Sequence, residues 1–329
     1  MDVSTPNAPN EALTSEFRSS LTSLIGPVAA GQRLGVAFSG GPDSLALLLL
    51  CRAAFPGQTR AATVDHGLRP DSRQEARHCA AVCQTLGVAH HILVPATAIT
   101  GSLQAAARAV RYHLLGEWAD ANRIAPVMTG HHADDQAETM AMRLNRGSGL
   151  AGLGSIRAVN GRIARPLLGW RRPVLAQVAR DSGLAVISDP SNQNDRFDRV
   201  RIRQALAQAD WLDVAAWGQS AAALAQAETA LAWAVTQAAA SRLSHSGDAI
   251  ILTDPAALPA EIRRRLVLLA LAGLDPAAAP SGPETARFIA TLMAGGKASI
   301  GHSVGENRDG SLVFRLAPPR SPRRATRSP

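Results

Sequence analysis

The chain has 329 residues, a length that predicts about two domains. Apolar residues make up 46% of the chain and aromatic residues only 4%, a balance typical of helices packed on a buried sheet. The formal net charge of +8 fits a polyanionic partner, although a basic balance alone is weak evidence for nucleic-acid binding.

The cysteines and the N-terminus exclude several classes of protein. Cys51, Cys79 and Cys83 form no CxxC pair and no zinc spacing, and they do not suggest a disulfide framework. The polar N-terminus lacks the pattern of a signal peptide, and no apolar run approaches 18 residues. We therefore expect a cytoplasmic protein without a membrane partner.

In chain order, a lead over residues 1–20 that we expect to be flexible is followed by alternating strands and helices. Strands are predicted at Leu34–Phe38, Ala61–Val64, Ala89–Val94 and Pro126–Thr129. Helices are predicted at Ser44–Ala54, Ser72–Leu86, Leu103–Asn122 and Asp134–Arg146. This alternation predicts an α/β fold with a Rossmann-like, doubly wound parallel sheet, in which ligands bind outside the carboxyl ends of the strands.

The second half of the chain follows a glycine-rich loop, Gly147–Gly154, and is expected to be mostly helical. Helices are predicted at Pro173–Ser182, from about Arg199, and over residues 213–243, 259–274 and 283–294; a hairpin is predicted from Ile300–Val304 and Ser311–Leu316. The change in character near residue 212 predicts a nucleotide-binding domain over 21–212 and an appended, mostly helical domain over 213–317. The proline- and arginine-rich tail, 318–329, is expected to be disordered.

The string SGGPDS, residues 39–44, follows the first predicted strand and opens a helix. Two glycines let the backbone curl so that successive N–H groups converge on an anion, and the helix N-terminus favours phosphate. Asp43 would repel phosphate, so its presence implies Mg²⁺ or a nearby arginine. An ordinary strand-to-helix turn is the alternative for a bare SGG, but the whole string in this context favours nucleotide binding.

The loop is not a Walker A motif, because no GxxxxGK[ST] string occurs. It resembles the SGGxDS signature of the PP-loop ATP pyrophosphatases, which have an adenine nucleotide alpha hydrolase-like fold. These enzymes cleave ATP between the α- and β-phosphates and transfer AMP to an acceptor oxygen. The resemblance implies ATP and Mg²⁺ as cofactors, with Asp43 as a catalytic residue and the metal ligand. The residues that it implies for ATP binding are Ser39, Gly40, Gly41, Pro42, Asp43 and Ser44.

Further motifs follow in order: VDHGLR at 64–69, RAVRY at 108–112, TGHHADDQAET at 129–139, SDPSN at 188–192 and RFDRVRIR at 196–203. Over about residues 30–205 they resemble the motif set of the tRNA(Ile)-lysidine synthetase family. One departure is Val200, which stands where the family usually has asparagine between two arginines. The hydrogen bonds of that asparagine are lost here, while the ATP site is not affected.

The resemblance implies two half-reactions on isoleucine tRNA with a CAU anticodon. Oxygen 2 of the wobble cytidine first attacks the α-phosphate of ATP, and the ε-amine of free L-lysine then attacks carbon 2 and expels AMP. The region 213–317 would bind the tRNA. The family also suggests a homodimer, which the residues themselves do not indicate.

Asp135 and Glu138 lie three residues apart on one predicted helix face, so both carboxylates could point into one cleft. We assign them to lysine binding and amine deprotonation, with His132 beside them at the substrate. Arg111 is our candidate for charge stabilisation at the adenylated base. Arg201 and Arg203 are assigned to the carboxylate of lysine or to the tRNA.

Other interpretations of these residues remain open at this stage. The acidic run could simply complement a helix dipole, and the histidine pair could suggest zinc, although HExxH is absent. Trp211, Trp217 and Trp233 are expected to pack between helices and not to stack on bases. A tRNA thiolase is the nearest rival function, but it would need a persulfide-carrying cysteine or an iron–sulfur cluster. NAD and GMP synthetases share a similar loop, and a regulatory protein without chemistry is a further class.

Overall fold

The computed structural model describes residues 6–97, 103–154, 156–187 and 198–317. Its contacts divide the chain into two compact units, residues 1–225 and 226–329. The division falls inside helix α9 (Val214–Arg242), whereas the sequence placed it between residues 212 and 213. The SDPSN motif and the basic tail over 318–329 lie outside the described residues, so their predictions are not tested.

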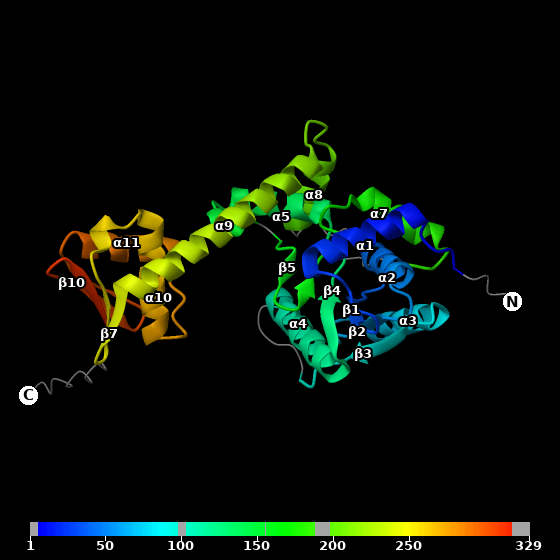
Figure 1. The fold of residues 1–329 in the computed structure, drawn as a ribbon, viewed down its shortest axis with the longest axis horizontal. Coiled ribbons are helices and arrows are strands. Elements are labelled where there is room, and N and C mark those ends of the chain that lie inside the picture. The colour runs from blue at the N-terminus through cyan, green and yellow to red at the C-terminus, as the bar shows by residue number, and fades with distance from the viewer. Residues whose placement is uncertain (1–5, 98–102, 155, 188–197, 318–329) are drawn as a thin grey trace, which may run out of the picture. The chain divides into compact units, whose positions relative to one another are not determined.

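The first unit is built on a sheet in the order β3-β2-β1-β4-β6-β5 (Figure 1). The first five strands in this order run parallel, and β5 pairs with β6 in the antiparallel direction. This confirms the Rossmann-like parallel sheet, while the two short strands β5 and β6 were not predicted. The strands are β1 (Arg33–Ala37), β2 (Thr59–Val64), β3 (Ala89–Leu93), β4 (Ile124–Met128), β5 (Val159–Asn160) and β6 (Ile163–Ala164).

Alternating side chains of the sheet enter two different cores. Val36 belongs to the core on one face and its neighbour Ala37 to the core on the other, as the two-residue period of a strand requires. Helices α1 (Glu11–Ile25), α2 (Pro42–Ala54), α3 (Ser72–Thr85) and α7 (Arg172–Asp181) contribute to the first core. Helix α4 (Leu103–Asn122) contributes Leu115 and Trp118 to the second. The sheet is therefore covered on both faces, as expected.

Helix α1 corrects the expectation of a flexible lead over residues 11–20, while residues 1–5 of that lead lie outside the described residues. Asn10 caps the helix by accepting a hydrogen bond from the backbone N–H of Leu13 at 2.9 Å. Phe17 and Leu21 are 0% exposed and lie in the core of the first unit. This helix was not predicted because most of its residues are polar. Its apolar positions are few, but they are fully buried, as in an amphipathic helix.

The strand order reverses at β1, whose neighbours are β2 on one side and β4 on the other. The loops that follow β1 and β4 therefore diverge at the carboxyl edge of the sheet, where open α/β sheets bind their ligands. Helix α5 (Ala133–Asn145) begins directly after the β4 loop and contacts α8 (Asp198–Ala207). The glycine-rich segment that follows α5 includes a short helix, α6 (Leu150–Leu153).

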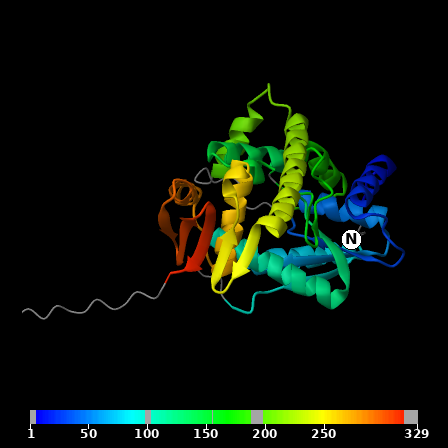
Figure 2. The ribbon, with the colours of Figure 1, turned by 60° about the vertical axis from the view of Figure 1, so that its left-hand side comes forward.

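The second unit combines the end of α9 with α10 (Ala260–Leu274), α11 (Gly282–Met293) and an antiparallel sheet (Figure 2). The sheet has the order β7-β8-β11-β10-β9. The helices and β11 confirm the expectations, whereas the first strand of the hairpin, expected at Ile300–Val304, is β10 and begins at Ser303. The rest of the sheet was missed because its strands are only four residues long. The strands of the whole sheet are β7 (Leu243–Ser246), β8 (Ala249–Leu252), β9 (Lys297–Ile300), β10 (Ser303–Arg308) and β11 (Ser311–Leu316).

Two of the three tryptophans do not pack between helices as expected. Trp211 is 75% exposed and Trp233 is 67% exposed, whereas Trp217 packs against the small core formed by α5 and the start of α9. Within the described residues, no helix combines the length and the apolar character needed to cross a membrane.

Candidate active site

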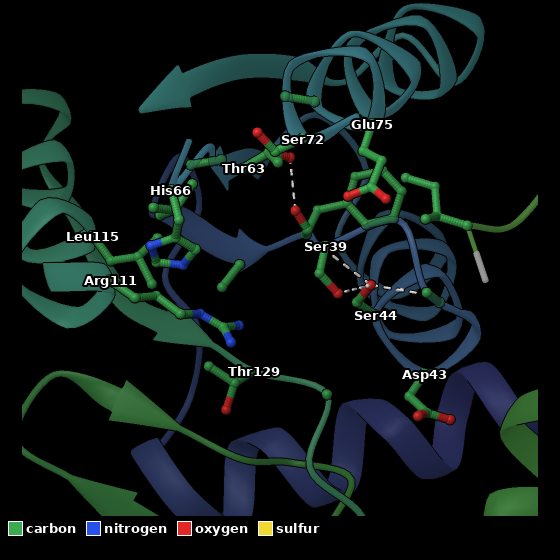
Figure 3. A pocket seen from close by; sticks show the side chains of 18 of the residues that line it. Ser39, Asp43, Ser44, Thr63, His66, Ser72, Glu75, Arg111, Leu115 and Thr129 are labelled. Carbon is green, nitrogen blue, oxygen red and sulfur yellow. Dashed lines mark hydrogen bonds between the residues drawn. The ribbon is translucent and has the colours of Figure 1, made fainter. Parts of the chain in front are cut away.

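A cavity of about 530 Å³ lies at the carboxyl edge of the first sheet. It is lined by segments that sequence analysis had singled out separately, and Figure 3 shows the side chains that face it. Its walls come from the loop after β1 (Ser39, Asp43, Ser44), the segment after β2 (His66, Arg69), α4 (Arg111), the loop after β4 (Thr129, His131), α5 (Asp135) and α8 (Arg199). The fold thus brings most of the predicted site residues into one place.

The loop after β1 has the form that the sequence predicted. Gly40 has φ +80°, a conformation that favours glycine, and an added Cβ would clash with the side chain of Ile187. Ser44 fixes the curl: its Oγ donates to the carbonyl of Gly41 at 3.0 Å and lies 3.2 Å from the backbone N–H of Ser39, which donates to it. No side chain of the described residues caps α2, so its first backbone N–H groups are available to an anion. Of the six predicted loop residues, Gly40 alone does not line the cavity.

Asp43 lies at the start of α2 with one carboxylate oxygen unsatisfied. Its Oδ1 is buried and has no hydrogen-bond partner in the described ranges, while Oδ2 lies 3.6 Å from Nε2 of His132. A buried carboxylate oxygen without a donor is costly in free energy, and a cation would remove that cost. Among the described residues, no group of three His, Cys, Asp or Glu side chains is arranged to hold a metal.

His132 caps α5 and is buried beneath the cavity. Its Nδ1 accepts from the backbone N–H of Asp135 at 3.3 Å, and Oδ2 of Asp135 accepts from the backbone N–H of His132 at 3.1 Å. Burial by itself lowers the pKa of His132, but the carboxylates of Asp43, Asp135 and Asp134 outweigh burial and raise it. The side chain is 1% exposed and does not line the cavity, so the substrate-binding role expected for His132 stays a prediction. In this structure His132 links the loop after β1 to α5.

The loop after β4 packs directly on the loop after β1. A Cβ added to Gly130 would lie 2.9 Å from the carbonyl oxygen of Asp43 and 3.1 Å from the backbone nitrogen of Ser44. Both neighbours are backbone atoms and cannot move aside cheaply. The glycine of the TGHH string is therefore required for this close approach.

The two carboxylates of α5 are not equivalent, although they share one helix face. Asp135 lines the cavity, whereas Glu138 is 3% exposed and lies behind it. Glu138 accepts from Nε of Arg199 at 2.9 Å and from Nε and Nη2 of Arg203 at 2.5 and 3.0 Å. Burial raises the pKa of Glu138, but the two arginines outweigh it and lower the pKa.

The role expected for Glu138 stays a prediction, and this network bears on it. A buried carboxylate that two guanidinium groups engage and whose pKa is lowered is a poor base, and Glu138 does not line the cavity. Arg199, which sequence analysis did not select, also donates to Asp135 Oδ1 at 2.8 Å and lines the cavity. Arg199 and Arg203 are four residues apart and therefore share one face of α8, just as Asp135 and Glu138 share one face of α5. This matching spacing of opposite charges is the signal that could have identified Arg199.

Arg201 is not brought to the cavity. Its side chain is 66% exposed and pairs with Oδ1 of Asp198 at 2.6 Å. It lies with Arg146 at a separate surface depression between α5 and α8. Of the two arginines assigned to substrate, Arg203 therefore lies next to the site through Glu138, and Arg201 does not.

The opposite wall of the cavity is basic. The guanidinium of Arg111 extends from α4 into the cavity (Figure 3), and it has no hydrogen-bond or ion-pair partner within the described part of the chain. Burial, and after it the charges of Arg165, Arg111, Arg108 and Arg199, lower the pKa of His131 to about 3. Its Nδ1 lies 2.8 Å from Oγ1 of Thr129. His131 is therefore neutral, and Arg165 is a contributor that sequence analysis missed.

The cysteines take no part in this site. All three are buried, and burial raises the pKa of Cys51 and Cys83 to about 12 and that of Cys79 to about 11. Since a thiolate is the reactive form of cysteine, these thiols are inert at neutral pH.

Comparisons with known proteins agree with this geometry. Residues 13–210 match the family described as a PP-loop domain. The tRNA(Ile)-lysidine synthase of Zymomonas mobilis is 41% identical over 314 residues, covering 92% of this chain and 94% of its own length. That of Novosphingobium aromaticivorans is 42% identical over 296 residues, covering 87% of this chain and 89% of its own length.

Among solved structures, the U34-tRNA thiolase NcsA from Methanococcus maripaludis matches 66% of this chain and 79% of its own. The TM-score is 0.53 and the identity is 16%, so the match shows a shared fold alone.

Proposed function

This chain belongs to the tRNA(Ile)-lysidine synthase family of PP-loop proteins, and from that premise we propose that it uses ATP to join free L-lysine to carbon 2 of the wobble cytidine in CAU-anticodon isoleucine tRNA. The product, lysidine, pairs with A and not with G, so the tRNA reads AUA in place of AUG. The observation that carries the proposal is the SGGPDS loop facing Arg111 and Asp135 across one cavity.

In the first step, oxygen 2 of the cytidine attacks the α-phosphorus of ATP. The bond between this phosphorus and the oxygen that bridges to the β-phosphate breaks, and pyrophosphate leaves. The curled loop and the uncapped N-terminus of α2 bind the phosphates. Arg111 extends into the cavity from the opposite wall and stabilises the charge of the adenylated base.

Asp43 fits a magnesium ligand, because its Oδ1 is buried without a partner. Mg²⁺ is commonly held by one or two carboxylates together with substrate phosphates, so a cluster of three protein ligands is not needed. When bound, it would neutralise charge on the phosphates.

In the second step, the ε-amine of lysine attacks carbon 2, the bond from carbon 2 to oxygen breaks, and AMP leaves. The amine must be positioned and must lose a proton. We assign both tasks to Asp135, because it is the α5 carboxylate that lines the cavity. Glu138 holds Arg199 and Arg203 in place, and Arg199 in turn holds Asp135.

A tRNA thiolase is the rival that shares this fold, and the cysteines argue against it. Thiolation needs a reactive sulfur, whereas Cys51, Cys79 and Cys83 are buried thiols with raised pKa values and do not line the cavity. We assign tRNA binding outside the cavity to the second unit, expect the reaction in the cytoplasm, and take the homodimer as a prediction from the family.

Radiolabelled lysine tests the proposal. Purified protein, ATP and Mg²⁺ should incorporate it into a transcript of CAU-anticodon isoleucine tRNA, and Asp43→Ala should abolish incorporation. Incorporation that persists in Asp43→Ala would remove the loop from the mechanism. Release of pyrophosphate that depends on tRNA, without incorporation of lysine, would retain the adenylation step and show that lysine is not the nucleophile.

A further inference from the structure

Two arginines outside the cavity lining join Arg111 in a basic cluster between α4 and the end of β6. Arg108 is exposed on α4, and Arg165 follows β6 directly and is only 4% exposed. Within the described ranges, neither has a carboxylate partner. The guanidinium of Arg165 donates to neutral groups: Nη1 to the carbonyl of Arg157 at 2.6 Å, and Nη2 to the hydroxyl of Tyr112 at 3.5 Å.

Arg165 is therefore a buried cation that no carboxylate of the described residues neutralises. Its Nε is buried and has no hydrogen-bond partner in that part of the chain. Burying a charge without an opposite charge costs free energy, and the cost falls when an anion binds nearby. The arrangement indicates a ligand with negative charge on this side of the site.

Tyr112 connects the buried arginine to the exposed one. The guanidinium of Arg108 lies 5.0 Å from the centre of the Tyr112 ring, a stacked cation–π geometry. The hydroxyl of the same ring accepts from Arg165. Stacking restricts the flexible Arg108 side chain before any ligand arrives, so less conformational entropy is lost when it binds an anion.

The position of the cluster separates it from the phosphate loop. β6 pairs with β4 on the side away from β1, so Arg165 follows a strand two places from the one that carries the SGGPDS loop. Neighbouring strands are about 4.8 Å apart, which places the two strand ends roughly 10 Å apart. Arg165 therefore lies to one side of the phosphate loop, and we infer that its anion comes from the acceptor molecule.

We propose that Arg108, Tyr112 and Arg165 form a binding site for a backbone phosphate of the tRNA beside the reacting cytidine. Arg108 contacts the phosphodiester, and Tyr112 and Arg165 are positioning residues that hold Arg108. The inference rests on the proposed function, because it takes its anion from the tRNA substrate. A guanidinium suits this task, since its fork of N–H groups matches the oxygens of a phosphate. The depressed pKa of His131 supports a basic environment here.

Arg108→Gln tests the contact directly. We expect the KM for tRNA in lysine incorporation to rise about tenfold, because one charge-assisted hydrogen bond to the phosphate is lost. The slope of log K against log salt for tRNA binding should fall by about 0.7, as for one phosphate contact on a single strand. Arg162→Gln is the matched control, because Arg162 is an exposed arginine of the same unit that already pairs with Asp120 at 2.7 Å. It should change neither quantity.

Arg165→Met and Tyr112→Leu test the positioning role. Both should raise the KM for tRNA several-fold with kcat nearly unchanged, and Tyr112→Phe, which keeps the ring, should have the smaller effect. The affinity for a fluorescent ATP analogue should stay the same in all variants. A merely structural role would lower the melting temperature and kcat together and would contradict the proposal.

Two results would contradict the proposed phosphate-binding site. An Arg108→Gln variant with unchanged KM and salt dependence would show that no phosphate binds there. Weaker ATP binding with normal tRNA binding would show that the phosphate belongs to ATP. The salt dependence is measured on tRNA binding alone, so it tests the phosphate-binding site even if the wild type incorporates no lysine. Such a result would contradict the proposed ligase activity and leave the test of the binding site intact.

Discussion

The arginines on the two sides of the cavity differ in what neutralises them. On α8, Arg199 and Arg203 are held by the carboxylates of Asp135 and Glu138 at 2.5–3.0 Å. On the side of α4 and β6, three arginines have no carboxylate partner within the described residues: Arg108, Arg111 and Arg165. The first group is neutralised within the protein, and we propose that the second group finds its opposite charge in a bound anion.

This difference separates residues that build the site from residues that meet its ligands. A carboxylate between two guanidinium groups contributes to folding and fixes the geometry of α5 against α8. A buried arginine without an opposite charge, such as Arg165, destabilises the free protein, and such conflicts between stability and local chemistry are typical of functional positions. Substitutions in the two groups should therefore affect stability in opposite directions.

The largest effect is expected from Glu138→Ala. Removing a buried carboxylate leaves Arg199 and Arg203 facing each other without compensation, a change that typically costs 3–5 kcal/mol. Arg199 is 42% exposed, and solvent screens part of the repulsion, so we expect about 2 kcal/mol. Urea denaturation measures it, with Glu117→Ala, in an exposed pair with His113, as the control that should change the free energy of unfolding by less than about 0.5 kcal/mol. Equal effects at the two glutamates would remove the distinction between the groups.

Arg165→Met should have the opposite sign. Replacing a buried, unpaired cation by an apolar side chain of similar volume removes a desolvation penalty and is often neutral or stabilising. We expect the free energy of unfolding to rise by about 1 kcal/mol while the KM for tRNA increases. A loss of stability on urea denaturation would mean that its bonds to Arg157 and Tyr112 outweigh the cost of burial.

The pH dependence of stability should sharpen the contrast at Glu138. The pKa of this carboxyl is lowered in the folded protein, so its contribution is fully present above the unfolded value of about 4.3 and is lost as the pH falls through the folded value. The difference in unfolding free energy between wild type and Glu138→Gln should be largest at neutral pH and should shrink below about pH 4.3. A difference that stays constant down to pH 3 would show that the ion pairs do not hold this carboxyl.

The sequence was sufficient for the longer strands of the first unit and for α2–α5, α7 and α8, because a buried parallel sheet produces strong apolar runs and its helices are amphipathic. It missed α1, α6 and the two-residue strands β5 and β6. It also located the phosphate loop, since the whole SGGPDS string between a strand and a helix is typical of phosphate binding. It did not distinguish Asp135 from Glu138. Helical spacing gives the face of a side chain but not its partner, and the partner came from α8, more than 60 residues later.

Arg165 was missed for a related reason. In the sequence it is one arginine within a basic stretch, and nothing local shows that it is buried, or that it approaches Tyr112 from 53 residues away. Outside its hairpin, the sheet of the second unit was missed because β7, β8 and β9, with four residues each, give little periodicity. Long-range pairing, and not local propensity, decided each of these features.

Arg201→Gln should have the smallest effect of all. Arg201 belongs to the same helix as Arg199 and Arg203, but its side chain is 66% exposed and its partner, Asp198, is itself largely in solvent. A surface pair of this kind contributes little to stability because water screens it and both side chains lose conformational freedom. We therefore expect the melting temperature and the KM for lysine to match those of the wild type, measured beside Arg203→Gln, which should change both. A raised KM for lysine in Arg201→Gln alone would show that α8 turns this arginine toward the substrate during catalysis, and that the division between α8 and α4 arginines does not hold once the site is occupied.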